Sequence, residues 1–400
     1  MNHPHGPDHQ LHGEYYGLGP LDEYPIHQLP RPVAWAGSSD RNFYDRCYLN
    51  AHDRSGDLFL ITGLGFYPNL GTKDAFVLLG RRGASPTGGI EHTAVHLGDA
   101  ADPRGADRMA QQVGNYRVEV IEPLHKLRLV LEETEGIAMD LTWEGSFPVV
   151  QELPHVMRQG SGTTLDAQRF AQLGSWEGVL SVDGADIAVT PDRWVGSRDR
   201  SWGIRPVGEA APGGKPADPA FEGMWWLYVP IRFDDFCVVL IIQETPDGFR
   251  TLNDCTRVWR DGRVEQLGWP RVRVRYEPGT RIPTGATIVC TTPRGEELVL
   301  EVESLLPTPI HVGGGYGGDS DWTHGMWKGA GFTERVTYDL NDPTVAGRVM
   351  FGVIDHVGRA TVSGPGAGCP DGSEGWGLFE HGVLGRHEPS GFNDWFDLAP

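Results

Sequence analysis

The fold of this 400-residue chain is indicated first by Gly178-Val179-Leu180-Ser181-Val182-Asp183-Gly184 and by the segment that follows it, Ile187-Ala188-Val189-Thr190. Apolar and polar residues alternate in both segments, as they do in a half-buried β-strand. The dipeptide Asp183-Gly184 between them is a strong signal for a tight hairpin turn. The stretch therefore predicts an antiparallel β-hairpin.

Short strand patterns of the same kind recur along the whole chain, each bounded by turn residues such as Gly, Pro or Asp. They predict strands at 57–62, 75–79, 116–121, 127–131 and 137–143, and again at 224–230, 236–243, 257–260, 271–276, 287–291 and 297–303. The best candidates for short helices are 106–113 and 165–173. Many short strands at near-regular spacing predict an all-β sandwich or barrel protein.

The two series of strands are separated by residues 209–219, which are rich in Pro, Gly and Ala and predict a linker or a long surface loop. We therefore expect two β-domains, residues 1–208 and residues 220–400. The pair of strand patterns at 117–120 and 127–131 resembles the pair at 271–274 and 286–290, which favours an internal duplication.

The composition argues against several classes of protein. A formal net charge of -20 opposes binding to nucleic acid or to an anionic membrane, because both are bound by clustered Lys and Arg. No apolar stretch approaches the roughly 18 residues of a membrane span. The N-terminus also lacks the apolar core of a signal peptide, so we expect a cytoplasmic protein that does not insert into membranes.

Motifs for metal binding and hydrolysis are missing from the sequence. The five cysteines are scattered without a CxxC motif, which predicts buried free thiols rather than disulfides or a zinc site. The histidines among the first twelve residues favour a mobile polar tail over a metal site. Neither H-E-x-x-H nor G-x-S-x-G occurs, and the glycine-rich segments 63–66 and 313–318 predict loops rather than phosphate cradles.

A cluster of charged and aromatic residues follows the hairpin, with the sequence Trp194-Val195-Gly196-Ser197-Arg198-Asp199-Arg200-Ser201-Trp202-Gly203. A carboxylate set between tryptophans loses contact with water. Such burial raises the pKa of the carboxyl group, so that the group can serve as an acid catalyst. Strand alternation places Asp199 and Ser201 on one face and their neighbours on the other. Two interpretations remain open: Asp199 forms a structural ion pair with an arginine, or it lies in a barrel mouth and exchanges protons.

A second aromatic segment, Trp225-Trp226-Leu227-Tyr228, opens the second half of the chain. Alternation puts Trp226 and Tyr228 on one face and Trp225 on the other. One face belongs to a core, and the other is either an interface between barrels or the aromatic wall of a ligand cavity. Near the C-terminus, Glu380 and His381 place an acid beside an imidazole, and His381 is either a base or a structural histidine.

The region from Gly178 to Gly203 resembles the AttH-like and carotenoid-hydratase-like family of tandem lipocalin-like proteins. Members of that family show the pattern G-x-L-x-V-D-G, then a Trp and a D-H-x-W-G box. Here the pattern reads Gly178-Val179-Leu180-Ser181-Val182-Asp183-Gly184, then Trp194, then Asp199-Arg200-Ser201-Trp202-Gly203. An aromatic strand and an apolar strand follow the box, as in the family, at 225–228 and 236–243.

The resemblance implies two lipocalin-like antiparallel β-barrel domains in tandem, with a cavity in or between them. It also implies chemistry on apolar polyene, isoprenoid or polyketide-like molecules with neither a metal nor an organic cofactor. One position departs from the family, because Arg200 stands where the box usually has His. An arginine does not release its proton near neutral pH, so any role of that imidazole is lost or moved.

We therefore expect a cofactor-independent hydratase, dehydratase, isomerase or cyclase that acts on a hydrophobic terpenoid, steroid or polyketide-like small molecule. Such a reaction needs an acid that protonates carbon and a wall that tolerates a carbocation. We expect Asp199 to be the general acid or base and His381 or Glu244 to be the second polar group. The expected substrate contacts are Arg198, Arg200, Trp202, Arg205, Trp225, Trp226, Tyr48 and His324.

Two other functional classes remain open on the sequence. The first is a non-catalytic carrier of hydrophobic ligands, because a lipocalin-like cavity binds such ligands without any acid. The second is a scaffold or partner-binding module whose barrels are filled by large side chains. The sequence leaves the oligomeric state open, a homodimer included.

Overall fold

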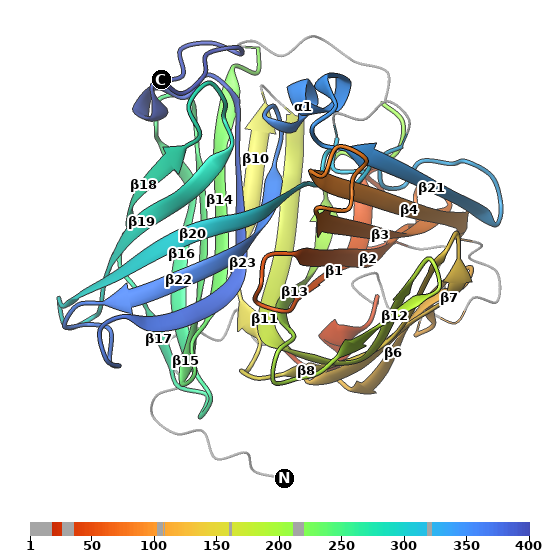
Figure 1. Cartoon of the computed structure of the whole chain (residues 1–400), viewed down its shortest axis with the longest axis horizontal. Coiled ribbons are helices and arrows are strands. Elements are labelled where there is room, and N and C mark those ends of the chain that lie inside the picture. The colour runs from red at the N-terminus through yellow and green to blue at the C-terminus, as the bar shows by residue number, and fades with distance from the viewer. Residues whose placement is uncertain are drawn as a thin grey trace.

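Two curled antiparallel β-sheets in tandem make up the fold (Figure 1). The structure is a computed structural model that describes residues 18–25, 36–101, 107, 109–159, 162–210, 220–317 and 322–400. The predicted all-β class with two lipocalin-like β-barrel domains is confirmed. The hairpin predicted at Asp183-Gly184 also forms.

The larger sheet has the strand order β21-β4-β3-β2-β1-β13-β11-β8-β7-β6-β5, and β9, β10 and β12 also pair with β11. Its strands are β1 (Phe43–His52), β2 (Leu58–Tyr67), β3 (Thr72–Arg82), β4 (Ile90–Ala100), β5 (Gln111–Val113), β6 (Tyr116–Glu122), β7 (Lys126–Thr134), β8 (Ile137–Gly145), β9 (Val150–Gln151), β10 (His155–Gln159), β11 (Gly162–Val182), β12 (Ala185–Val189), β13 (Val195–Ile204) and β21 (Phe332–Asp339). The long strand β11 lies at its centre and pairs with β13 on one side and β8 on the other.

The smaller sheet has the order β17-β16-β15-β14-β23-β22-β20-β19-β18. Its strands are β14 (Gly223–Arg232), β15 (Phe236–Glu244), β16 (Arg250–Trp259), β17 (Val264–Gln266), β18 (Arg271–Tyr276), β19 (Pro283–Thr291), β20 (Glu297–Pro309), β22 (Ile354–Ser363) and β23 (Ser373–Gly385). Short helical turns are found at η2 (Pro20–Glu23), α1 (Pro343–Val349) and η3 (Glu388–Ser390). Within the described ranges, none of the helices is long and apolar enough to cross a membrane.

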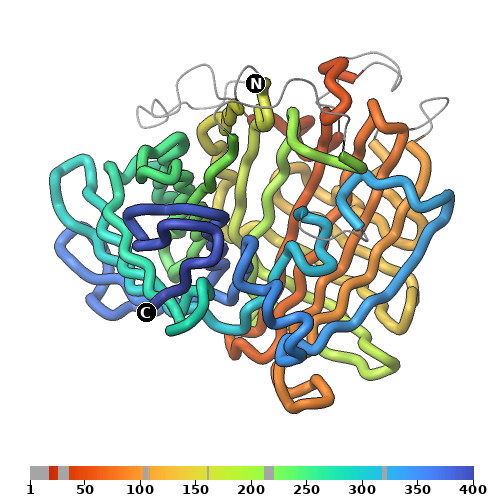
Figure 2. Tube along the Cα trace, turned by 90° about the horizontal axis from the view of Figure 1, so that it is seen from above, coloured from red at the N-terminus to blue at the C-terminus, as the bar shows by residue number. Residues whose placement is uncertain are grey.

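One strand crosses the division expected at residues 209–219. Strand β21 belongs to the second half of the chain, yet it pairs with β4 at the edge of the larger sheet. Figure 2 shows the blue segment that carries it lying beside the orange strands of the first half. Most of the expected linker, residues 211–219, lies outside the described residues, as do the N-terminal histidines.

The hairpin formed by β11 and β12 shows why its glycines are needed. Asp183 and Gly184 have φ angles of 50° and 80°, which suits a two-residue turn with positive φ at both central positions. At Gly178 the φ angle is 138°, and a Cβ atom would lie 2.0 Å from the carbonyl oxygen of Asp140. Only glycine therefore lets β11 and β8 approach so closely at that point.

Both predicted helices are wrong in the part that the structure describes. Residues 165–173 have a helix-favouring composition, but they lie within β11, where hydrogen bonding to neighbouring strands on both sides overrides the local preference. Of residues 106–113, the last three form β5 and pair with β6, whereas 106 and 108 lie outside the described residues.

The three largest apolar clusters of the described residues hold the sheets together. One fills the larger barrel and includes Trp143 and Trp176, and a second fills the smaller barrel and includes Trp225. The third joins residues from both sheets, among them Phe76 and Trp226. Four of the cysteines are buried and Cys369 is half-buried, and all five are free thiols.

Candidate functional site

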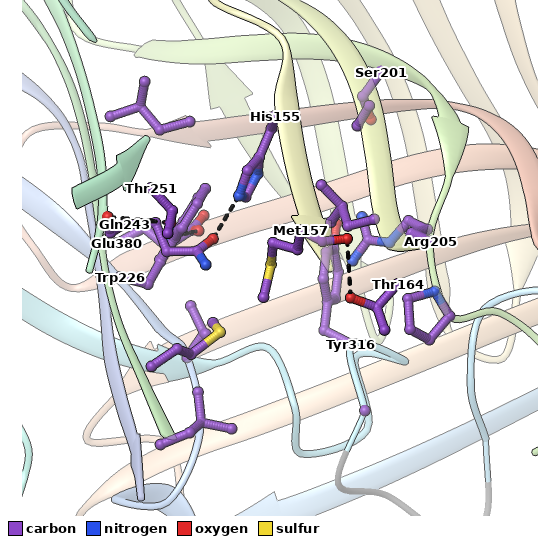
Figure 3. Close-up of a pocket in the computed structure, with 18 of the residues that line it drawn as sticks. His155, Met157, Thr164, Ser201, Arg205, Trp226, Gln243, Thr251, Tyr316 and Glu380 are labelled. Atoms are coloured by element: carbon purple, nitrogen blue, oxygen red, sulfur yellow. Dashed lines mark hydrogen bonds between the residues drawn. The ribbon is translucent and has the colours of Figure 1, made fainter. Parts of the chain in front are cut away.

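A cavity of about 660 Å³ lies between the two sheets. Its walls come from β1, β10, β11 and β13 of the larger sheet and from β14, β15 and β23 of the smaller one (Figure 3). The aromatic part of the wall consists of Tyr44, Tyr48, Phe221, Trp226, Tyr316 and Phe351. Aliphatic side chains such as Ile241 and Leu384 complete it. The volume and lining suit a drug-sized apolar ligand.

Asp199 lies on the cavity wall, on β13, with Tyr48 of β1 as its cross-strand partner. Burial raises the pKa of its carboxyl group, while the positive charges of Arg169, Arg46 and Arg205 act in the opposite direction. Among the described residues, no cation lies within 4.0 Å of its carboxylate oxygens. Asp199 is therefore a half-buried acid that faces a cavity rather than a member of a close ion pair.

The neighbours of Asp199 follow the alternation expected for a strand. Ser201 also lines the cavity, whereas Arg198 and Arg200 point to the other face of β13. The guanidinium of Arg198 donates to both carboxylate oxygens of Glu23 at 2.6 and 2.8 Å. That of Arg200 donates to Asp45 at 2.8 Å. The structure thus places both arginines in buried ion pairs of the larger barrel, and it places Trp202 outside the cavity lining as well.

In the smaller sheet, Asp355 and Glu380 form a pair of carboxyl groups: the half-buried Glu380 lines the cavity, and the buried Asp355 lies behind it, outside the lining. They are register partners in β22 and β23, so their side chains lie on the same face of the smaller sheet. Burial, followed by the charge of Glu380, raises the pKa of Asp355 well above its ordinary value, and burial raises the pKa of Glu380 too. The hydroxyl of Tyr48 donates to Asp355 at 2.5 Å, and the indole N–H of Trp226 donates to Glu380.

Arg169 and Glu152 supply a further charged pair in the cavity wall. The Nε atom of Arg169 donates to a carboxylate oxygen of Glu152 at 2.6 Å, and its guanidinium carbon lies 4.5 Å from the centroid of the Tyr228 ring. Burial raises the pKa of Glu152 to about 7 even though the charge of Arg169 opposes that shift. The cavity therefore holds a carboxyl group that titrates near neutral pH.

Of the two expected histidines, neither lines the cavity. The Nδ1–H of His381 donates to the backbone carbonyl of Trp226 at 2.6 Å, and Nε2 accepts from the hydroxyl of Tyr276 at 2.9 Å. Burial lowers the pKa of His381 to about 3. His324 packs against aromatic rings with Nδ1 3.4 Å from a carboxylate oxygen of Asp74, and burial lowers its pKa well below the ordinary value.

The remaining expected residues divide between the cavity and the cores. Trp226 lines the cavity, whereas Trp225 lies in the core of the smaller barrel and stacks on His387 at 5.7 Å. Glu244 lines the cavity and accepts from Arg250 at 2.9 Å. Burial alone would raise the pKa of Glu244, but its hydrogen bonds to His387 and Arg250 lower it.

The structure thus brings five of the residues expected from the sequence into the cavity. They are Asp199, Glu244, Tyr48, Arg205 and Trp226. It places the other six outside the lining, namely His381, His324, Arg198, Arg200, Trp202 and Trp225.

Sequence reasoning missed Arg169, Glu152, Asp355 and Glu380 as parts of the site. Arg169 lay in a segment predicted to be helical, so its position on a strand face was hidden. For Glu380 a signal existed, because alternation places it on the face of β23 opposite to His381. Asp355 and Glu152 carry no local signal.

Across the described ranges, no cluster of three or more His, Cys, Asp or Glu side chains could hold a metal ion.

Fold and cavity together define a tandem lipocalin-like β-barrel protein with ionisable groups in an internal, largely apolar cavity. The chain belongs to DUF8625, a family of unknown function, whose model matches residues 18–393. No curated protein matches the sequence.

Several solved structures are similar to this chain. Kievitone hydratase from Nectria haematococca is 13% identical, with 90% of this chain and 94% of that chain covered at a TM-score of 0.48. A putative AttH from Nitrosomonas europaea is also 13% identical, with 85% and 92% covered at a TM-score of 0.43. CghA is 13% identical, with 88% and 90% covered at a TM-score of 0.49. At these identities the likenesses concern the fold alone.

Proposed function

We propose that this protein is an enzyme that carries out acid–base catalysis, without a cofactor, on a hydrophobic small molecule held between its two sheets. The reaction class is hydration or dehydration of a carbon–carbon double bond, isomerisation or cyclisation, and the substrate is terpenoid, steroid or polyketide-like. The observation that carries the proposal is the position of Asp199, whose carboxyl group faces an aromatic cavity and has a raised pKa. Burial of this kind favours the neutral form of a carboxyl group, which is the form that can donate a proton.

In the hydration direction, the neutral carboxyl of Asp199 donates its proton to one alkene carbon and becomes a carboxylate. A carbocation is left on the adjacent carbon, and water adds to it. The proton that this water loses returns to a carboxylate of the wall, either Asp199 itself or Glu152. Dehydration follows the same steps in reverse. In isomerisation the carbocation loses a proton from a neighbouring carbon to the carboxylate. In cyclisation a second double bond attacks the carbocation, and the new carbocation then loses a proton to the carboxylate.

The aromatic wall supports such charged intermediates. The rings of Tyr48, Trp226 and Tyr316 line the cavity, and each aromatic face stabilises a nearby cation by roughly 0.5 to 2 kcal/mol. The carboxyl pair of Asp355 and Glu380 accepts hydrogen bonds from Tyr48 and Trp226, so we assign the pair a positioning role that fixes two of these rings.

The proposal is tested with a panel of apolar alkenes and their hydroxylated counterparts, incubated with the full chain in ¹⁸O-labelled water and analysed by mass spectrometry. We expect conversion of at least one pair, with ¹⁸O in the hydrated product. Replacing Asp199→Asn should lower turnover by about 10²-fold or more, the usual contribution of a general acid. The matched control is Asp186→Asn, the same change at an exposed position of β12, which should leave turnover unchanged.

The same panel separates an enzyme from a carrier. A carrier would bind the panel members without forming product, and Asp199→Asn would bind them as the wild type does. Full turnover by Asp199→Asn on a converted substrate would count directly against the catalytic role of this residue.

A further inference from the structure

Two arginines converge on one aromatic ring in the cavity. The guanidinium carbons of Arg46 and Arg205 lie 4.7 and 5.6 Å from the centroid of the Tyr316 ring, and all three residues line the cavity. In Figure 3, Arg205 and Tyr316 lie together on one side of the cavity, and Trp226 and Glu380 lie on the other. The cavity therefore has a cationic end that is distinct from the end with the carboxyl pair.

The two arginines lack a close negative partner in the part of the chain that the structure describes. Arg46 is only 4% exposed, and its Nη1 atom is buried without a hydrogen-bond partner. The half-buried Arg169, a third arginine of the wall, has such a partner in Glu152 at 2.6 Å. Asp199 lies close enough to Arg46 and Arg205 for their charges to lower its pKa, but not within 4.0 Å of either.

A buried charged donor without an acceptor is costly, so these groups call for a ligand that supplies negative charge. Arginine presents a rigid fork of N–H donors that matches a carboxylate better than any other side chain does. The ring of Tyr316 holds both guanidinium groups by cation–π contact, which orders them before a ligand arrives.

We propose that Arg46 and Arg205 bind the carboxylate of an amphiphilic acid, so that the substrate carries an anionic head and an apolar body. This inference rests on the proposed function and names the substrate class for the same cavity. The carboxylate occupies the Tyr316 end, and the apolar body lies along the wall formed by Trp226 and Ile241.

The experiment measures whether the cavity prefers an acid over the matching alcohol. The full chain is titrated with the neutral fluorescent probe N-phenyl-1-naphthylamine, which is then displaced by dodecanoate or by dodecan-1-ol at about pH 8, where a free carboxylic acid is ionised. We expect the wild type to bind dodecanoate at least about tenfold more tightly, a difference of about 1.4 kcal/mol. Arg205→Gln and Arg46→Gln should each reduce this preference to about twofold or less.

Arg193→Gln is the matched control, since the Arg193 side chain is 64% exposed and lies outside the cavity lining. It should keep the preference for the acid. If circular dichroism shows that Arg46→Gln does not fold, the Arg205→Gln variant decides the outcome, because Arg205 is only half-buried.

Each result bears on one of the two proposals. Equal binding of acid and alcohol by the wild type, or an undiminished preference in Arg205→Gln, would overturn the carboxylate site and leave acid–base catalysis on a neutral substrate standing. Failure of N-phenyl-1-naphthylamine to bind at all would instead contradict the hydrophobic cavity on which the proposed function depends.

Discussion

Asp355 and Glu380 face each other as register partners on β22 and β23, and the charge of Glu380 adds to burial in raising the pKa of Asp355. Two carboxyl groups so close cannot both be ionised without a large cost, so the pair retains a proton. Tyr48 reaches Asp355 from the other sheet with a hydrogen bond of 2.5 Å. The pair is therefore a polar contact that joins the two sheets beside the cavity.

Replacing Asp355→Asn should change how stability depends on pH. A carboxyl group whose pKa is raised by folding stabilises the protein fully below its unfolded pKa, about 3.9, and the stabilisation is lost as the pH rises through the folded pKa. Because Asn cannot ionise, we predict that the free energy of unfolding falls less steeply with rising pH in the variant. Chemical denaturation at a series of pH values measures this slope, and Asp186→Asn is the control.

An unchanged slope in Asp355→Asn would show that the pair does not hold a proton in the folded state. A slope that also flattens in Asp186→Asn would mean that net charge, rather than the pair, governs the dependence.

Replacing Arg198→Met should destabilise the fold without weakening ligand binding. The guanidinium of Arg198 and the carboxylate of Glu23 are each 2% exposed, and removing one partner of such a pair leaves a buried charge, which costs about 3 to 5 kcal/mol. The control is Arg193→Met, which removes a pair with Asp53 whose arginine is 64% exposed and should cost less than about 1 kcal/mol. Thermal and chemical unfolding measure both changes.

The contrary outcome is an Arg198→Met variant that is as stable as the wild type but binds the ligand less tightly. It would return this arginine to the substrate contacts expected from the sequence.

His381 should remain neutral well below its ordinary pKa. Burial lowers its pKa to about 3, so the unfolded chain takes up a proton near pH 6.5 while the folded protein does not. Stability from this group is therefore present above about pH 6.5 and is lost as the pH falls toward 3. Long-range ¹H–¹⁵N spectra of histidine-labelled protein should show a neutral ring protonated at Nδ1 at pH 5. A titration midpoint near 6.5 would make His381 a credible base after all.

Much of the site geometry follows from strand alternation alone. The period of two correctly separates Asp199 and Ser201 from Arg198 and Arg200, because successive side chains of a strand point to opposite faces. Alternation cannot say which face meets a cavity. That depends on the packing of the smaller sheet against the larger one, which no local pattern records.

The parts of the site that the sequence did not predict come from distant pairings. Arg169 looked helical because Leu, Ala, Gln and Arg surround it, and only pairing with β13 on one side and with β9 and β10 on the other makes the segment a strand. Asp355 becomes part of the site through its register with Glu380 and through Tyr48, which is more than 300 residues away in the chain. The ion pair of Arg198 with Glu23 joins residues 175 positions apart in the chain, so its structural role was hidden as well.

The central claim is tested most directly by titrating the side-chain carboxyl of Asp199, using ¹³C-labelled aspartate and assignment by its loss in Asp199→Asn. Burial raises its pKa against the charges of three cavity arginines, so we predict a midpoint above the ordinary value of about 3.9. We also predict a further rise in Arg205→Gln, where one opposing charge is gone. A midpoint at or below about 3.9, unmoved by Arg205→Gln, would mean that Asp199 is fully ionised at neutral pH and cannot be the proton donor.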